Sequence, residues 1–242
     1  MTHASVPIRT VTDIPAVTMS QMREVDRIMI EDLHIELMQM MENAGRNLAR
    51  LARQRFRPEH PVVLVGSGGN GGGGMVAARH LANWGLDVRV VLGREREAFG
   101  PVPAHQLDVL ERMGVEVSSR PEPGDLHLDA LIGYSLVGDP RGRSAELIGW
   151  LADQEAPVLS LDTPSGLDVT SGEAGDPVVT ADATLTLAAP KTGLVGARQV
   201  GELYVADISV PPAAYSAFGL SMPPDLFADG AVVRLVSSSR RP

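Results

Sequence analysis

Short apolar runs alternate along most of the sequence with helical or turn-rich segments, and this order constrains the fold more than any other feature. The segments with strand character are residues 62–65, 88–92, 115–117, 128–132, 158–161, 183–187 and 203–208. Helical patterns between them begin near Gly74, Val102 and Arg143. Most of the apolar runs are continuous, as expected of strands whose two faces are both covered by helices. The sequence therefore predicts an α/β fold, a three-layer sandwich with a mainly parallel, Rossmann-like sheet.

Two helices are predicted ahead of the first of these strands. Thr18 and Gln21 have the spacing of a capping box, in which each side chain bonds to the backbone of the other residue. The apolar residues that follow at helical spacing are Met22, Val25 and Met29. A second helix is predicted from about residue 36, and one of its faces carries Leu37, Met40, Met41, Ala44, Leu48 and Leu51. These two helices form an N-terminal extension of the sandwich.

The chain is predicted to form one domain with loose ends. Its 242 residues are enough to bury a substantial core, and no repeat or low-complexity linker divides them. We expect a flexible tail at residues 1–17, a single domain at residues 18–236 and a second flexible tail at residues 237–242.

Charge and composition exclude several classes of function. The net charge of −9 argues against nucleic acid or an anionic membrane as the main partner. The chain contains no cysteine, which excludes disulfides, thiolate zinc sites, iron–sulfur clusters and cysteine nucleophiles. The sequence shows neither a signal peptide nor a run of the ~20 apolar residues that span a membrane. We therefore expect a cytoplasmic protein.

The stretch "GSGGNGGGG", residues 66–74, follows the first predicted strand, and seven of its nine residues are glycine. Glycine lets backbone N–H groups approach a phosphate, and the N-terminus of the following helix favours an anion. The G-x-G-x-x-G match is unspecific, because Gly93 and Arg94 stand where a dehydrogenase carries its ribose-binding acid. No Lys-Ser or Lys-Thr pair follows, so the stretch is not a triphosphate P-loop. A tight turn without a ligand is the simpler alternative.

Three polar, turn-forming segments each follow a predicted strand. They are "GSGGNGGGG", "DALIGYSLVGDPRG" and "DTPSGLD". Ligands of open α/β sheets bind outside the carboxyl ends of the strands, and the carboxyl ends of parallel strands share one edge. The sequence therefore predicts a ligand site where these segments meet.

Six blocks in the same order, from about Val17 onwards, resemble the NAD(P)H-hydrate epimerase family, the N-terminal domain of the YjeF type. The first contains "MENAG", and the glycine stretch with "MVAARHL" resembles the family's "GPGNNGGDGLVAARHL". The third, "LDALIGYSLVGDPRG", and the fourth, "SLDTPSGLD", resemble the family's next blocks. "ADATLTLAAPKTGLV" and "GELYVADISVPPAAY" complete the order.

The resemblance implies an isomerase of nicotinamide cofactor repair. Such an enzyme interconverts the R and S forms of hydrated NAD(P)H, written NADHX or NADPHX. It also implies one bound potassium ion per subunit, a separate NAD(P)H-hydrate dehydratase as functional partner, and a homodimer. The methionine-rich stretch 38–41 is then either helix core or a dimer interface.

The resemblance assigns three potassium ligands, Asn70, Asp129 and Ser165. All three carry the hard oxygen atoms that such cations prefer. The alternatives are that Asp129 caps a turn and that Ser165, after Pro164, serves turn chemistry.

The resemblance also places the substrate and the catalytic carboxylate. The substrate-binding residues that it implies are Asn70, Gly71, Gly72, Gly133, Tyr134, Ser135, Leu136, Val137, Gly138, Asp139 and Asp162. Asp162 ends an apolar strand and is expected to act as the acid/base or orienting carboxylate. The alternative is an aspartate that starts a turn before Pro164. Lys191 either approaches the cofactor's phosphates or is solvated.

Two positions depart from the family pattern. Gly69 replaces an asparagine and Gly73 replaces an aspartate. Glycine supplies no acid, base or ion ligand, so a non-catalytic nucleotide-binding or interaction protein with the same fold is the alternative function. A redox dehydrogenase is a more distant third, because the ribose acid is missing.

Overall fold

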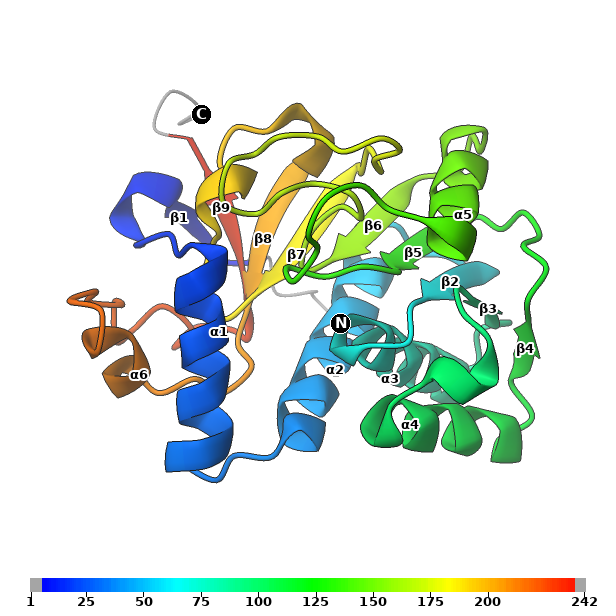
Figure 1. The fold of residues 1–242 in the computed structure, drawn as a ribbon, viewed down its shortest axis with the longest axis horizontal. Coiled ribbons are helices and arrows are strands. Elements are labelled where there is room, and N and C mark those ends of the chain that lie inside the picture. Colours follow the sequence, from blue (N-terminus) through cyan, green and yellow to red (C-terminus); the bar gives the residue numbers. More distant parts are fainter. Residues whose placement is uncertain (1–5, 238–242) are drawn as a thin grey trace.

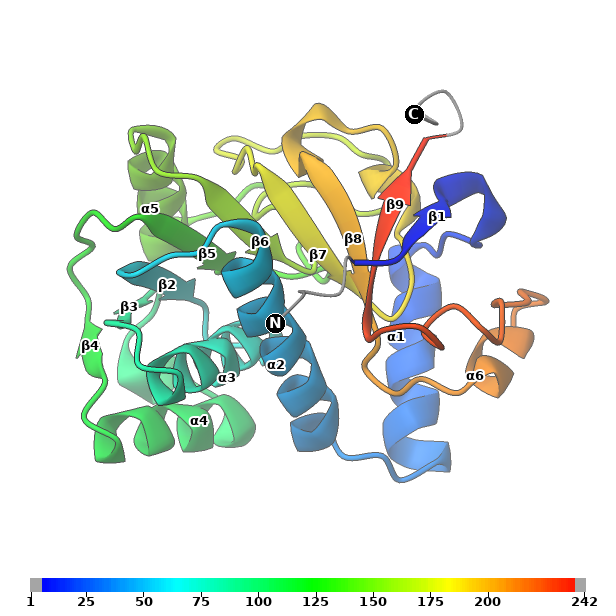
Figure 2. The same ribbon diagram turned by 180° about the vertical axis from the view of Figure 1, so that it is seen from behind.

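The computed structural model describes residues 6–237, and nine strands of this part of the chain form a single sheet (Figures 1 and 2). The strands are β1 (Ile8–Thr10), β2 (Pro61–Val65), β3 (Arg89–Leu92), β4 (Glu116–Ser118), β5 (Leu126–Ala130), β6 (Val158–Leu161), β7 (Ala183–Leu187), β8 (Glu202–Ala206) and β9 (Val232–Val236). Their order across the sheet is β1-β9-β8-β7-β6-β5-β2-β3-β4. Neighbouring strands run parallel except β8 and β9, which are antiparallel. The predicted mainly parallel sheet is confirmed.

Helices cover both faces of this sheet. They are α1 (Met19–Arg27), α2 (Leu37–Arg55), α3 (Gly69–Asn83), α4 (Pro101–Arg112), α5 (Gly142–Ala152) and the short α6 (Pro212–Ser216). Short 3-10 segments lie at Val11–Asp13, Arg96–Ala98, Thr192–Leu194 and Arg198–Val200. In this part of the chain, no helix combines the length and the apolar character that crossing a membrane requires.

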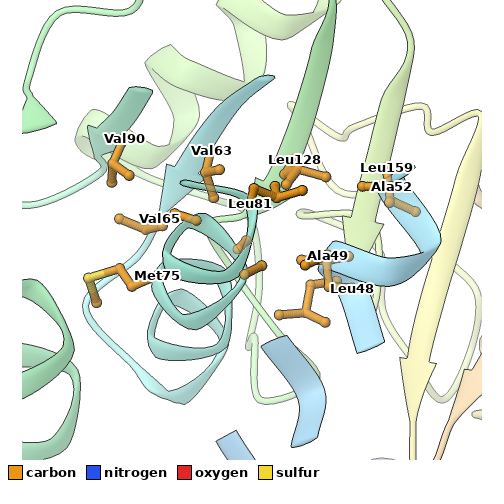
Figure 3. Packing of buried hydrophobic residues seen from close by; sticks show 14 of the residues in the cluster. Leu48, Ala49, Ala52, Val63, Val65, Met75, Leu81, Val90, Leu128 and Leu159 are labelled. Atoms are coloured by element: carbon orange, nitrogen blue, oxygen red, sulfur yellow. The ribbon is translucent and has the colours of Figure 1, made fainter. Parts of the chain in front are cut away.

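Alternate residues of the central strands supply two separate cores. Val63 and Val65 belong to the cluster that contains Leu48 of α2 and Leu81 of α3 (Figure 3). Val62 and Leu64, which point to the other face, belong to a second cluster with Leu147 and Ile148 of α5. Side chains of a strand alternate between its faces, so a continuous apolar run serves both layers at once. The predicted three-layer sandwich is confirmed.

The two N-terminal helices follow their sequence signals. Thr18 caps α1, and the capping box with Gln21 is complete in both directions. A π-helical turn, Ile28–Asp32, extends α1, and α2 then begins after its N-cap, Glu36. Met40 and Met41 of α2 are buried, whereas Leu37 and Met38 are exposed. The methionine-rich stretch is thus partly core and partly surface.

The expectation of a loose tail at residues 1–17 is wrong for residues 8–17. Residues 8–10 form β1, which pairs with β9, and Ile14 and Val17 are buried. The last strand was also missing from the prediction, although its sequence "VVRLV" alternates between buried and half-buried residues. Residues 1–5 and 238–242, the outer parts of the two predicted tails, lie outside the described residues.

The helix predicted from near Gly74 begins earlier, at Gly69. Its glycines from Gly71 to Gly74 are packed rather than free, because neighbouring elements approach them closely. A Cβ atom at Gly72 would lie 2.4 Å from Sδ of Met41, and one at Gly45 of α2 would lie 2.5 Å from the carbonyl oxygen of Gly73. Small residues therefore let α2 and α3 come together backbone to backbone, and this contact overrides glycine's poor helix propensity.

Candidate active site

A cavity of about 790 Å³ opens at the edge of the sheet where the parallel strands end. Four strands, β2, β5, β6 and β7, lead directly into its wall, and residues of α1 and α2 close its other side. Its volume is in the range of sites that hold small molecules and cofactors. Predicted site residues that line it are Asn70, Gly133, Tyr134, Ser135, Leu136, Val137, Asp139 and Asp162.

Three residues predicted to bind substrate do not line this cavity. Gly71 lies against the turn before the helix, since a Cβ atom there would be 1.8 Å from the carbonyl oxygen of Gly66. Gly72 packs on Met41 of α2. Gly138 has a φ of 74° and belongs to the bend of its loop rather than to the cavity wall. The assignments of these three residues to substrate binding stay predictions, and the structure shows that Gly71 and Gly72 pack closely against neighbouring elements.

Asp162 is the first residue after β6 and is almost fully buried, with 3% of its surface exposed. Its φ of 67° is unusual for a residue with a side chain and marks a constrained position. Nζ of Lys191 donates to its Oδ1 at 2.5 Å, and the backbone N–H of Tyr134 donates to its Oδ2 at 3.0 Å. The carboxylate is thus fixed at the cavity wall by two donors from different segments.

Lys191 is not a solvated lysine. Its side chain is fully buried, and its ammonium group donates to Asp162, to Oγ1 of Thr186 at 3.0 Å and to the carbonyl oxygen of Leu187 at 2.9 Å. A buried ammonium requires such partners because the loss of water is costly. Lys191 therefore holds Asp162 in place, and the interpretation of a solvated lysine is wrong. Its approach to the cofactor's phosphates stays a prediction, and Lys191 is among the residues that line the cavity.

The structure adds a second carboxylate that sequence reasoning missed. Asp26 of α1 lines the cavity, and the hydroxyl of Tyr134 donates to its Oδ2 at 2.5 Å. Burial raises the pKa of Asp26, and the hydrogen bond from Tyr134 opposes this rise. Burial and the charge of Asp26 also raise the pKa of Tyr134. The sequence held one signal, because Asp26 follows the buried Met22 by about one helical turn and so shares its face.

The predicted cation ligands form two groups. Asp129 and Ser165 touch each other in the interior, where Oγ of Ser165 donates to Oδ1 of Asp129 at 2.6 Å and its N–H donates to Oδ2 at 2.9 Å. Ser160 and the backbone of Leu131 also donate to this carboxylate. Burial raises the pKa of Asp129, against the effect of these hydrogen bonds. Neither Asp129 nor Ser165 lines the cavity.

Asn70, the third predicted ligand, lies at the cavity. Both polar atoms of its amide are buried and lack a hydrogen-bond partner within residues 6–237. A Cβ atom at Gly133 would lie 3.2 Å from Cβ of Asn70 and 3.3 Å from Oδ2 of Asp162, so Gly133 separates the two side chains. Because a buried amide without partners is costly, Asn70 fits a position that contacts a ligand or an ion.

The two glycines that depart from the family pattern have different surroundings. A Cβ atom at Gly69 would meet nothing within 4 Å. Gly73 lines the cavity, and a Cβ atom there would lie 2.9 Å from Cδ2 of Leu161 and 3.8 Å from Cβ of Ala44. A side chain at position 73 would therefore enter an apolar part of the cavity wall.

Two helix N-termini face the cavity. Residues 66–70, which include the start of α3, line one side, and Arg141 and Ser144 from the start of α5 line another. Free backbone N–H groups and the helix dipole make such ends favourable for anions. Arg94, which follows β3 by two residues, adds a second arginine to the wall beside Arg141. This part of the cavity is suited to phosphate groups.

Comparisons with known proteins agree with this architecture. The family described as "YjeF-related protein N-terminus" matches residues 37–193. An NAD(P)H-hydrate epimerase of Dehalogenimonas lykanthroporepellens is 46% identical over 94% of this chain and 95% of its own length. A bifunctional NAD(P)H-hydrate repair enzyme, Nnr, of Salinibacter ruber is 34% identical over 82% of this chain, which spans 41% of that protein. The crystal structure of yeast ynu0, YNL200c, has a TM-score of 0.79 and 25% identity, and the match covers 92% of this chain and all of that one.

Proposed function

The chain belongs to the family of YjeF-related protein N-termini, and from this premise we propose that it is an NAD(P)H-hydrate epimerase. One observation carries the proposal. A buried carboxylate, Asp162, is fixed by Lys191 at the wall of a cavity that also presents two helix N-termini. Such a cavity offers a proton-transfer group at one place and anion binding at another, and a hydrated dinucleotide needs both. The name of a relative matched over nearly its whole length supports the same activity.

The proposed substrate binds with its pyrophosphate at the helix N-termini. The starts of α3 and α5 offer backbone N–H groups, and Arg94 and Arg141 add positive charge. The hydrated nicotinamide ring then lies near Asp162, beside Gly133 and Tyr134. Gly133 leaves room there, because any side chain at this position would meet both Asn70 and Asp162.

The proposed reaction inverts the carbon that bears the hydroxyl group. A general acid protonates this hydroxyl, the C–O bond breaks, and the lone pair of the ring nitrogen forms a C=N bond as water leaves. Water then adds to the opposite face of the planar iminium and loses a proton to a general base. No net oxidation occurs, so the site needs proton-transfer groups and a surrounding that stabilises the positive ring. The carboxylate of Asp162 supplies both a proton-transfer group and a negative charge.

The decisive experiment follows one pure epimer of NADHX in potassium buffer. We expect the purified protein to accelerate its conversion to the other epimer, measured by separating the two forms over time. A rate equal to that of the buffer alone would overturn the epimerase proposal. Binding of NADPHX without acceleration would favour the alternative, a non-catalytic nucleotide-binding protein, which the glycines at positions 69 and 73 favour.

We also propose a potassium ion close to Asn70, with Asp129 and Ser165 as further oxygen donors. The unpartnered buried amide of Asn70 supports this assignment, and the carboxylate of Asp129 would supply the negative charge that a cation requires. A bound cation would offset the charge of the dinucleotide's phosphates.

Potassium is expected to stabilise the protein specifically. A potassium concentration of about ten times the dissociation constant should raise the melting temperature by about 3–5 °C. The reference is the melting temperature in a choline salt at the same ionic strength. Asn70→Ala should abolish this difference in melting temperature. The substitution removes the one proposed potassium ligand that lines the cavity. Equal melting curves in the two salts for the wild-type chain would argue against the ion.

The proposed partner is a separate NAD(P)H-hydrate dehydratase. Relatives named bifunctional repair enzymes are more than twice as long as the part that matches this chain, which supports a second activity in the same repair. A cytoplasmic location and a homodimer are parts of the same proposal. Ile30, Leu33, Leu37 and Met38, which are exposed around the α1–α2 connection, support a protein contact there.

A further inference from the structure

We propose that Asp26 is a second catalytic proton-transfer group of this epimerase and that Tyr134 positions it. This inference rests on the proposed function and goes beyond it, because it assigns one carboxyl group to each face of the substrate ring. Asp162 serves the face towards the sheet edge, and Asp26 serves the face towards α1.

Tyr134 connects the two carboxyl groups through its two ends. Its backbone N–H donates to Oδ2 of Asp162 at 3.0 Å, and its hydroxyl donates to Oδ2 of Asp26 at 2.5 Å. Asp26, Tyr134 and Asp162 all line the cavity. The length of a tyrosine therefore separates the carboxyl groups, and they stand on different walls of one space.

The second oxygen of Asp26 is available for chemistry. Tyr134 occupies Oδ2, and no hydrogen bond or ion pair among residues 6–237 engages Oδ1. Each oxygen of Asp162 accepts one hydrogen bond, from Lys191 or from Tyr134, and keeps a second lone pair that can face the substrate. Burial raises the pKa of Asp26, which favours a protonated group that can donate to a departing hydroxyl.

Epimerisation makes demands on both faces of the ring. In one direction, a carboxylic acid gives its proton to the hydroxyl on its own face, and the C–O bonding pair leaves with water. The ring nitrogen supplies the electron pair of the new C=N bond. Water then attacks from the other face and gives a proton to the carboxylate there. The reverse direction exchanges the two roles, so each carboxyl group is acid in one direction and base in the other.

The test distinguishes two events at the carbon that bears the hydroxyl group. One is exchange of the hydroxyl with water on the same face of the ring, and the other is inversion of the carbon. A single epimer of NADHX is incubated in oxygen-18 water with the wild-type enzyme or with Asp26→Asn, and both epimers are analysed for label. In the variant we expect interconversion to fall by about 10²-fold or more. Label should still enter one epimer with retained configuration, because Asp162 can still remove and return water on its own face. Tyr134→Phe should show the same pattern with a smaller loss of interconversion, about tenfold.

Asp32→Asn is the matched control. It makes the same chemical change on the same helical segment, but Asp32 is exposed and pairs with Arg27 outside the cavity. We expect this variant to retain wild-type activity.

The alternative is that Asp26 only supports the fold of the loop through Tyr134. In that case Asp26→Asn would lower interconversion and one-face label exchange in the same proportion for both epimers, and this result would overturn the proposal. Wild-type interconversion in Asp26→Asn would overturn it as well. Failure of the proposed function gives a different result from failure of this inference. In that case the wild-type protein accelerates neither the interconversion of the epimers nor the exchange of label.

Discussion

Asp162→Asn is expected to lower the turnover of epimer interconversion by about 10²–10⁴-fold, the contribution of a general acid–base group. Asparagine has the shape of aspartate and tolerates the positive φ of this position better than most residues. Its single oxygen can accept from Lys191, and the hydrogen bond from the N–H of Tyr134 is lost. The variant should therefore fold and retain its cavity while it loses the group that exchanges a proton. Turnover of NADHX and calorimetric binding of NADPH measure the two properties separately.

Asp168→Asn provides the comparison for this variant. Asp168 follows in the same loop, accepts hydrogen bonds from the backbone of Thr170 and Ser171, and does not line the cavity. We expect its turnover to equal that of the wild-type chain. A turnover of Asp162→Asn close to wild type would remove Asp162 from the chemistry and leave it a structural role beside Lys191.

Gly71→Ala is expected to lower the free energy of unfolding by about 3 kcal/mol or more. The added Cβ would lie 1.8 Å from the carbonyl oxygen of Gly66, which is a backbone atom and cannot rotate away. The turn is itself fixed, since the N–H of Gly66 donates to the carbonyl oxygen of Ala130 in the neighbouring strand. In thermal unfolding, this loss corresponds to a melting temperature about 6–12 °C lower.

Gly69→Ala is the control, because it adds the same atom in the same helix where nothing lies within 4 Å. Alanine is the better helix former, so the free energy of unfolding should rise by up to about 1 kcal/mol. Urea unfolding of the two variants gives the comparison directly. Equal stability of both would mean that the turn at Gly66 relaxes to accept the side chain, against the close approach seen in the structure.

Local patterns predicted much of the fold. The capping box of Thr18 and Gln21 and the continuous apolar strands each depend on neighbours in sequence, and both are confirmed. The start of α3 was misplaced because glycine disfavours helices on its own, whereas here the packing of α2 decides. The last strand, β9, is as long as β2, and it was missed because its place in the sheet depends on pairing with β8 and with the distant β1.

In the candidate site, too, the residues that local sequence patterns mark were predicted, and contacts between distant segments were not. Asp162 is marked in the sequence by its place directly after an apolar strand, and the structure places it at the cavity. Its partner Lys191 lies 29 positions further along the chain, and Asp26 lies 108 positions before Tyr134. No spacing in a single sequence reveals such contacts. For the same reason the burial of Lys191 was not foreseen, since lysine is normally exposed unless a partner is provided.

The pairing of β1 with β9 affects the order in which the strands of the sheet associate during folding. Ile8 lies opposite Arg234, so nearly all of the described chain separates these two paired residues. Strands β2, β3 and β5 can associate earlier, because fewer residues separate them. Closing a loop of nearly the whole chain carries the largest entropic cost in the sheet. Strand β1 is therefore expected to wait until β9 has been synthesised, and its docking to be among the final events in the folding of this sheet.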